Sequence, residues 1–173
     1  LPDGWRAETI PFPLSFAPEL SYTGLEELRF APGMFQPDAE DFFSYAFIWW
    51  VDAGTLLEAD ALAEELEAYF RGLSAAVMAD AGVPEDAVFD ARLSPRRTKD
   101  VSVQRFEGRI DTFEPFATKA QVLLHLRVEA FNCLDPDHRA VYFALSPQTE
   151  EHAVWKQFRE IRDGFRCHGT AAK

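Results

Sequence analysis

Six charged or ionisable side chains alternate along two neighbouring segments of the chain and are its first candidates for chemistry. They are Arg105, Glu107, Arg109, His125, Arg127 and Glu129. Two antiparallel strands joined by a five-residue loop at 115–119 would place all six on one face, because side chains alternate along a strand. The loop length sets three opposed pairs: Arg105 with Glu129, Glu107 with Arg127, and Arg109 with His125.

Two interpretations of this row stay open. An imidazole beside a carboxylate could act as general acid and base while arginines hold an anionic substrate. The catalytic candidates would then be His125, Glu107, Glu129, Arg127 and Arg105. The alternative is a cross-strand charge ladder on a solvated face, worth about 0.2–1 kcal/mol per pair. We favour the ladder, and therefore no catalytic residue, because strand register alone accounts for every member.

A second group of potential ligands lies towards the C-terminal end of the chain. It comprises Cys133, Asp135, Asp137, His138, Cys167 and His168. Thiolates, imidazoles and carboxylates bind zinc, but this spacing matches no strong zinc motif, so we expect an Asp-Pro-Asp turn and no metal. The chain has two cysteines, and this even number permits a disulfide between Cys133 and Cys167 without requiring one.

Two further segments could bind a partner. The segment 92–99 holds four basic residues, and Arg96 and Arg97 could contact an anion or an acidic protein. The segment 42–51, FFSYAFIWWV, could line an apolar ligand pocket with Tyr45 and Trp49. A solvated charged surface and a packed core are the respective alternatives, and we favour these alternatives.

Two amphipathic helices are expected to carry apolar stripes against the sheet. The first stripe repeats every three or four residues: Leu62, Leu66, Phe70, Leu73 and Val77. The second helix, over 149–165, has its stripe at Val154, Phe158, Ile161 and Phe165. Each helix must bury its stripe, so each requires a separate apolar surface.

The N-terminal part of the chain is predicted to be an extended arm. Six prolines fall within residues 1–37, and proline cannot donate a hydrogen bond to a strand ladder, so we expect only short edge strands there, one of them at 26–31. In contrast, both alternating sets of 42–51 are apolar, which is typical of a central strand covered on both faces.

Three longer strands are predicted at 99–112, 121–131 and 139–145, with a further short one near 88–93. Short connections favour an antiparallel meander. Between the last two strands, matching of the apolar faces predicts Val128 near Val141 and Leu126 near Phe143.

These elements predict an α+β fold of one domain, residues 1–173, with the extended arm at 1–37. The sheet is expected to be antiparallel, with a mixed sheet as an alternative. Because the helices need two surfaces and 42–51 needs cover on both faces, we favour an α/β/α sandwich.

The net charge of the chain limits the classes of partner that it can bind. The 17 basic and 29 acidic residues give a net charge of −12, which disfavours nucleic acid and anionic membrane surfaces. Residues 1–91 hold three basic and eighteen acidic residues, whereas 92–173 hold fourteen basic and eleven acidic ones. No stretch is apolar for the roughly 18 residues of a spanning helix. The excess of Arg over Lys is typical of GC-rich bacterial coding.

Two resemblances add to these patterns. The stretch ELRFAPGMF at 27–35, followed by FFSY at 42–45, is similar to a group of uncharacterised exported bacterial proteins. The order of elements resembles the PsbP/Mog1-like architecture over most of the chain, in topology and without a diagnostic motif. The first resemblance implies a periplasmic or secreted protein, with the cytoplasm as the alternative. Neither implies an activity, a cofactor or a site residue.

Common catalytic and nucleotide-binding motifs are missing from the sequence. It has no phosphate-binding glycine loop, no GxSxG, no HExxH and no CxxC. We therefore expect a non-enzymatic, exported binding or protein-interaction domain without a cofactor, whose partner is a protein or a small molecule. The alternative is a small enzyme that uses the His125 row.

Overall fold

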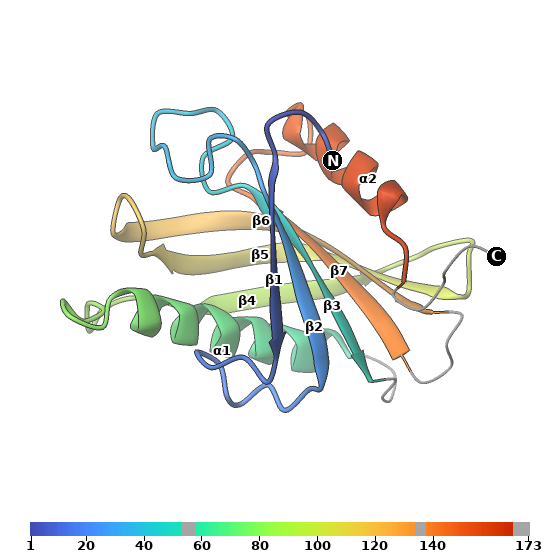
Figure 1. Ribbon diagram of the computed structural model, residues 1–173, viewed down its shortest axis with the longest axis horizontal. Helices are drawn as coiled ribbons and strands as arrows, with labels where there is room; N and C mark the ends of the chain where they lie inside the picture. The colour runs from blue at the N-terminus through green and yellow to red at the C-terminus, as the bar shows by residue number, and fades with distance from the viewer. Residues whose placement is uncertain (53–57, 134–137, 168–173) are drawn as a thin grey trace.

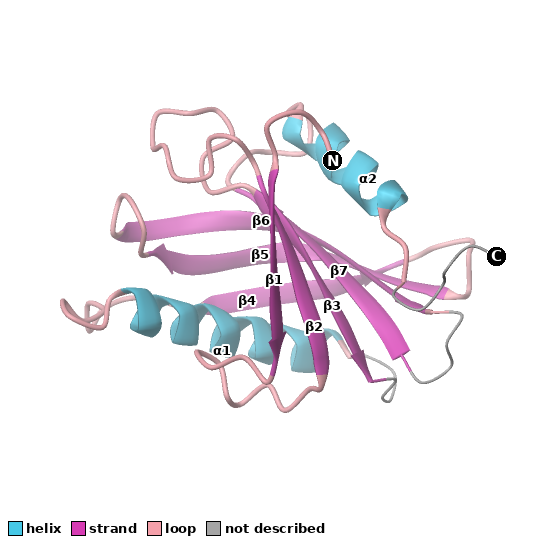
Figure 2. Cartoon of the chain, in the orientation of Figure 1, coloured by secondary structure: helices cyan, strands magenta, loops and turns pink. Residues whose placement is uncertain are grey.

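A computed structural model describes residues 1–52, 58–133 and 138–167 of the chain. Seven antiparallel strands form one sheet in the order β1-β2-β3-β7-β6-β5-β4 (Figure 1). The strands are β1 (Arg6–Phe12), β2 (Gly24–Phe30), β3 (Tyr45–Asp52), β4 (Asp90–Arg96), β5 (Val103–Glu114), β6 (Ala120–Asn132) and β7 (His138–Ser146). The helices are α1 (Ala59–Val77) and α2 (Val154–Gly164), shown in cyan in Figure 2.

The two helices pack on opposite faces of the sheet, which confirms the expected α+β sandwich. On β3, Phe47 and Trp49 belong to the core cluster that α1 covers, whereas Ala46 and Ile48 belong to the cluster that α2 covers. This is why both alternating sets of the strand are apolar. Within the described residues, neither helix is long and apolar enough to cross a membrane.

The N-terminal segment contributes more to the sheet than the sequence indicated. It forms two strands, and β2 is an internal strand between β1 and β3 rather than an edge. Of these two strands only β1 lies at an edge of the sheet, and it contains Pro11, whose missing N–H an edge tolerates. The strand predicted from Phe42 begins instead at Tyr45, because Phe43 has a φ of +47° and ends the preceding turn.

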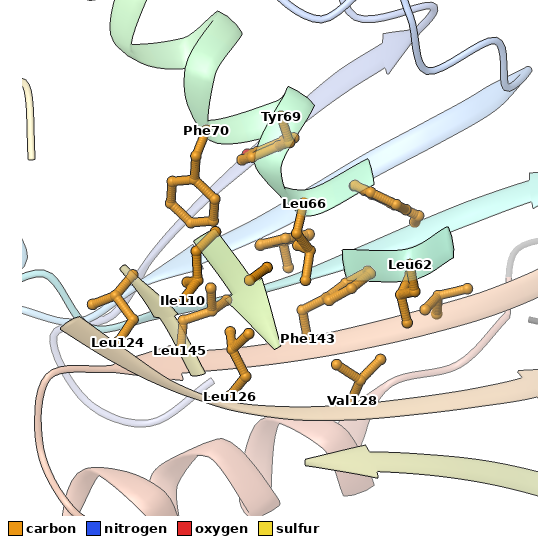
Figure 3. Packing of buried hydrophobic residues seen from close by; sticks show 14 of the residues in the cluster. Leu62, Leu66, Tyr69, Phe70, Ile110, Leu124, Leu126, Val128, Phe143 and Leu145 are labelled. Atoms are coloured by element: carbon orange, nitrogen blue, oxygen red, sulfur yellow. The ribbon is translucent and has the colours of Figure 1, made fainter. Parts of the chain in front are cut away.

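Helix α1 buries a slightly different stripe from the predicted one. Leu62, Leu66 and Phe70 face the sheet as expected, but Tyr69 is also buried, whereas Val77 is 41 % exposed. Figure 3 shows this stripe over the apolar side chains of β5, β6 and β7. The helix therefore presents Tyr69 to the core at a position that the predicted stripe omitted.

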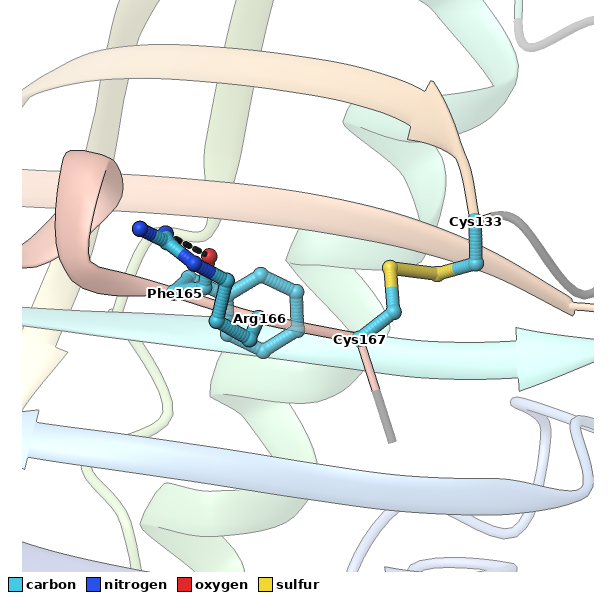
Figure 4. The surroundings of a disulfide bond; sticks show 4 residues. All are labelled: Cys133, Phe165, Arg166 and Cys167. Atoms are coloured by element: carbon cyan, nitrogen blue, oxygen red, sulfur yellow. Dashed lines mark hydrogen bonds between the residues drawn. A yellow bond between two sulfur atoms is a disulfide. The ribbon is translucent and has the colours of Figure 1, made fainter. Parts of the chain in front are cut away.

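The far end of the chain is tied to the sheet by a disulfide. Cys133, directly after β6, is bonded to Cys167, and their Cα atoms are 5.8 Å apart (Figure 4). This is the pair that the sequence permitted without requiring. The bond holds the segment after α2 against the end of β6, on the face that α2 covers.

Strand register was predicted with mixed success. The pairs Arg105–Glu129, Glu107–Arg127 and Arg109–His125 are confirmed. Between β6 and β7 the predicted matching of the apolar faces is confirmed, but the directly opposed pairs are Val128–Phe143 and Leu126–Leu145, two residues along from the predicted neighbours. A shift of two residues keeps every side chain on its face, so burial does not distinguish the two registers.

Candidate functional site

A hollow of about 500 Å³ lies on the face that α1 covers, between that helix and strands β1 and β2. We call it the α1 pocket. Its lining residues are Arg6, Ala7, Glu8, Ile10, Phe16, Leu28, Phe30, Met34, Phe35, Tyr45, Tyr69, Leu73 and Phe116. Helix α1 packs mainly on β4 and β5. The β1–β2 half of the same face is therefore left for loops to cover, and the pocket is the space that they leave.

The walls of the pocket come from elements far apart in the sequence. Phe16, in the segment between β1 and β2, packs edge-on against Tyr69 of α1, with ring centroids 5.2 Å apart. Gly72 permits this approach, because a Cβ there would lie 1.9 Å from the Phe16 carbonyl oxygen. Leu28 and Tyr45 are buried at the inner end.

The outer end of the pocket is formed by exposed residues. Arg6 and Glu8 alternate on β1 and point to the pocket side, opposite Phe30 and Leu28 of β2. Phe35 and Phe116 meet edge-on with centroids 5.3 Å apart, and the guanidinium of Arg6 lies 5.5 Å from the centre of the Phe35 ring. The pocket thus runs from a charged mouth to an apolar interior.

Two polar groups at the inner end lack hydrogen-bond partners among the described residues. One is the hydroxyl of Tyr45, which is buried. The other is Oε2 of Glu26, a carboxyl that is fully buried on β2 behind the pocket wall. Oε1 of Glu26 accepts a hydrogen bond of 3.0 Å from Nε1 of Trp49. Unpaired buried polar groups are rare in native proteins, so each needs an explanation.

Burial controls the ionisation of these groups. It raises the pKa of Glu26 to about 7, although hydrogen bonding from Trp49 and from the Tyr69 hydroxyl opposes the rise. Burial also raises the pKa of Tyr45 and of Tyr69, and the neighbouring Glu26 carboxylate adds to both shifts. Both tyrosines are therefore neutral hydroxyls; that of Tyr69 donates to Glu26, and that of Tyr45 keeps an unused donor.

The sequence-predicted charge row lies on the other face of the sheet. Glu129 accepts from Arg105 at 2.9 Å and from Arg162 of α2 at 3.0 Å. Glu107 pairs with Arg127 at 3.1 Å and with Arg96 at 3.4 Å. The row is therefore a ladder, but α2 closes over one end of it.

The alternative interpretation of this row, an acid–base pair of His125 with Glu107 or Glu129, is not supported by the positions of these side chains. Among the described residues, His125 makes no hydrogen bond to Glu107 or Glu129, whose oxygens are taken by arginines. His125 lies at the other end of the row, opposite Arg109 and Ser146. The geometry that general acid–base catalysis requires is absent between these residues in the described part of the chain.

The binding and metal-ligand candidates from the sequence lie in different parts of the structure. Trp49 is buried in the core and holds Glu26, whereas Tyr45 lines the α1 pocket. Arg96 and Arg97 line a polar hollow on the α2 face. Within the described residues no cluster of potential metal ligands is found. Asp135, Asp137 and His168 of the candidate zinc set lie outside those residues.

Sequence reasoning missed several residues that line the pocket or lie behind its wall. Glu26, Leu28 and Phe30 occupy alternate positions on β2, so a glutamate at an inward position was a readable signal once β2 was recognised as internal. Tyr69 was equally readable, three residues after Leu66 on α1. No local signal places Phe16 or Phe116, because only the tertiary fold brings their loops together.

Comparisons of the chain with protein-family models, with curated proteins and with solved structures give no match.

Proposed function

We propose that this protein is a non-enzymatic binding domain whose α1 pocket holds a small, mainly apolar molecule with one hydrogen-bonding group. The observation that carries the proposal is an apolar hollow of about 500 Å³ that is lined by Tyr45, whose buried hydroxyl has no hydrogen-bond partner among the described residues. Small-molecule sites have this character, with apolar and aromatic walls and a few polar groups that fix orientation.

The free-energy cost of a buried hydroxyl without a partner supports the same conclusion. A buried hydroxyl without a partner costs about 1–3 kcal/mol, and a ligand oxygen that accepts its hydrogen bond would recover part of that energy. The apolar walls add the burial of ligand carbon, at about 25 cal/mol per Å². At the mouth, Arg6 and Glu8 carry opposite charges, so the pocket selects no strongly charged head group. We therefore expect a neutral alcohol, ketone, ester or amide with an apolar body.

The compartment is part of the proposal. A disulfide persists in oxidising surroundings and is rare in the reducing cytosol, so the Cys133–Cys167 bond supports an exported protein. The stretches 27–35 and 42–45, on which the resemblance to exported bacterial proteins rests, also supply Leu28, Met34 and Tyr45 to the pocket. An extracytoplasmic carrier or sensor of an apolar molecule agrees with the disulfide and with this resemblance.

The test uses two aliphatic positions on α1, one turn apart. Leu73 lines the pocket, whereas Val77 is exposed on the same helix. The fluorescent apolar probe N-phenyl-1-naphthylamine should bind saturably to the unaltered protein with one site per chain. Leu73→Trp fills the hollow and should weaken binding at least about tenfold, which corresponds to roughly 1.4 kcal/mol.

Val77→Trp is the matched control and should leave the affinity within about twofold of the unaltered protein. Absence of saturable binding to the unaltered protein would overturn the proposal. So would equal weakening by the two tryptophans, because that result would place the probe somewhere other than the α1 pocket.

A further inference from the structure

A second concave surface lies on the opposite face of the sheet, where Arg162 of α2 reaches Glu129 of β6. It consists of two adjoining hollows of about 360 and 200 Å³, which share Arg96, Arg127 and Glu129. We call this surface the arginine groove. Six arginines line it: Arg96, Arg97, Arg105, Arg127, Arg159 and Arg162.

The groove concentrates positive charge in a protein whose net charge is −12. Only two glutamates, Glu129 and Glu150, line it with the six arginines. Glu129 is already neutralised by Arg105 and Arg162, Glu150 is paired with Arg127, and Glu107, beside the groove, is shared by Arg96 and Arg127, which leaves the six arginines in excess over three glutamates. Like charges crowded together repel, so a surplus of arginines in one hollow is stabilised when an anion enters.

Two arginines at the ends of the groove remain without an ion pair among the described residues. Arg97 lines the larger hollow and Arg159 of α2 lines the smaller one, and both are exposed. Between them, Arg127 is partly buried, and burial together with the nearby Arg96 lowers its pKa, against the effect of Glu107. These groups offer planar donor pairs that suit phosphate and carboxylate oxygens.

We infer that the arginine groove binds a small polyvalent oxyanion, a phosphorylated or multiply carboxylated molecule, that spans the two hollows from Arg97 to Arg159. A small occupant fits better than a long polyanion, because the acidic remainder of the surface repels an extended chain of negative charge. The inference is independent of the α1 pocket, which lies on the other face of the sheet.

The experiment titrates the protein with inorganic pyrophosphate and, separately, with citrate, by calorimetry at constant low ionic strength. We expect saturable binding of at least one of the two. Tighter binding of pyrophosphate would indicate a phosphorylated ligand, and tighter binding of citrate would indicate a carboxylated one. If neither anion binds saturably, the inference is wrong.

The double variant Arg97→Gln with Arg159→Gln removes two charges without breaking an ion pair of the described residues. It should unfold as the unaltered protein does and bind the anion at least about tenfold more weakly. Its control is Arg92→Gln with Arg109→Gln, which removes equal charge outside both hollows. The control should bind the anion with an affinity within about twofold of that of the unaltered protein. Equal weakening in both double variants would show that only the overall charge matters, and it would overturn the inference.

Discussion

The α1 pocket and the arginine groove lie on opposite faces of one sheet, and they differ in whether their polar groups have hydrogen-bond or ion-pair partners. At the groove, Glu129 is shared by arginines from β5 and α2, and the adjacent Glu107 by arginines from β4 and β6. In the pocket, the Tyr45 hydroxyl and one oxygen of Glu26 have no partner among the described residues. The pocket side therefore has unmet hydrogen-bonding capacity, whereas the groove has a surplus of positive charge.

This difference shows how two kinds of binding site can be recognised in the same fold. In an apolar interior an unpaired polar group costs about 1–3 kcal/mol, so its presence needs an explanation, and a binding site is one. In a hydrated groove an ion pair contributes only about 0–1 kcal/mol, so the pairs themselves carry little information. There, the informative feature is the excess of arginines over glutamates.

The largest expected effect concerns how α2 is held over the groove. Cys133→Ser with Cys167→Ser removes a bridge between residues 34 apart, and loop-closure entropy predicts a loss of about 3–4 kcal/mol in the free energy of unfolding. Urea denaturation measures this loss. Hydrogen exchange should become faster in α2 than in α1, and an unchanged urea midpoint would contradict this role.

The next effect concerns the buried carboxyl behind the pocket. Because the pKa of Glu26 is raised to about 7, the folded state binds its proton more tightly than the unfolded state. Stability is therefore highest when this carboxyl is protonated, and it falls as the pH rises from about 4.5 to about 7. Glu26→Gln removes the penalty and keeps an acceptor for Trp49.

At pH 8, Glu26→Gln should be more stable than the unaltered protein by about 1–3 kcal/mol, and at pH 4.5 the difference should nearly vanish. Thermal or urea unfolding at both pH values checks this. Glu64→Gln, an exposed glutamate on α1, is the control and should follow the unaltered protein at both. A stabilisation of equal size at the two pH values would contradict burial as its cause.

The smallest effect concerns the end of the ladder outside the groove. His125→Ala should change the free energy of unfolding by less than about 0.5 kcal/mol, because His125 makes no ion pair or hydrogen bond among the described residues. Urea denaturation would reveal a larger role. A loss above about 2 kcal/mol would mean that this histidine is structurally coupled to the groove.

Sequence patterns predicted the fold class and the charge ladder because both follow from periodicity. The five-residue loop between β5 and β6 determined that register correctly. The β6–β7 register was less determined, since registers two residues apart bury the same faces. The helix stripe on α1 was rotated away from Val77 because a period of 3.6 leaves the edge of a stripe poorly defined.

The sites were predictable only in part. Tyr45, Arg96 and Arg97 were binding candidates from their sequence context, and the structure places them in hollows on opposite faces. The pocket as a whole was hidden, because its walls join segments that lie far apart in the chain. Likewise, nothing local indicates that Arg159 of α2 reaches the groove, since that depends on where the helix packs across the sheet.

The most direct test of the central claim compares two buried tyrosines on the two faces. The Tyr142 hydroxyl donates to the Phe158 carbonyl at 2.8 Å, whereas the Tyr45 hydroxyl has no partner among the described residues. Tyr142→Phe should destabilise the protein by about 1 kcal/mol. Tyr45→Phe should stabilise the ligand-free protein by about 1 kcal/mol, because it removes an unpaired hydroxyl.

The same Tyr45→Phe variant should bind 1-octanol about five- to tenfold more weakly, measured by displacement of N-phenyl-1-naphthylamine, because the alcohol loses its hydrogen bond. Greater stability together with weaker binding is the result that a ligand site predicts. If Tyr45→Phe destabilises the protein as Tyr142→Phe does and leaves the affinity for 1-octanol unchanged, the hydroxyl is structural and the α1 pocket is not the binding site.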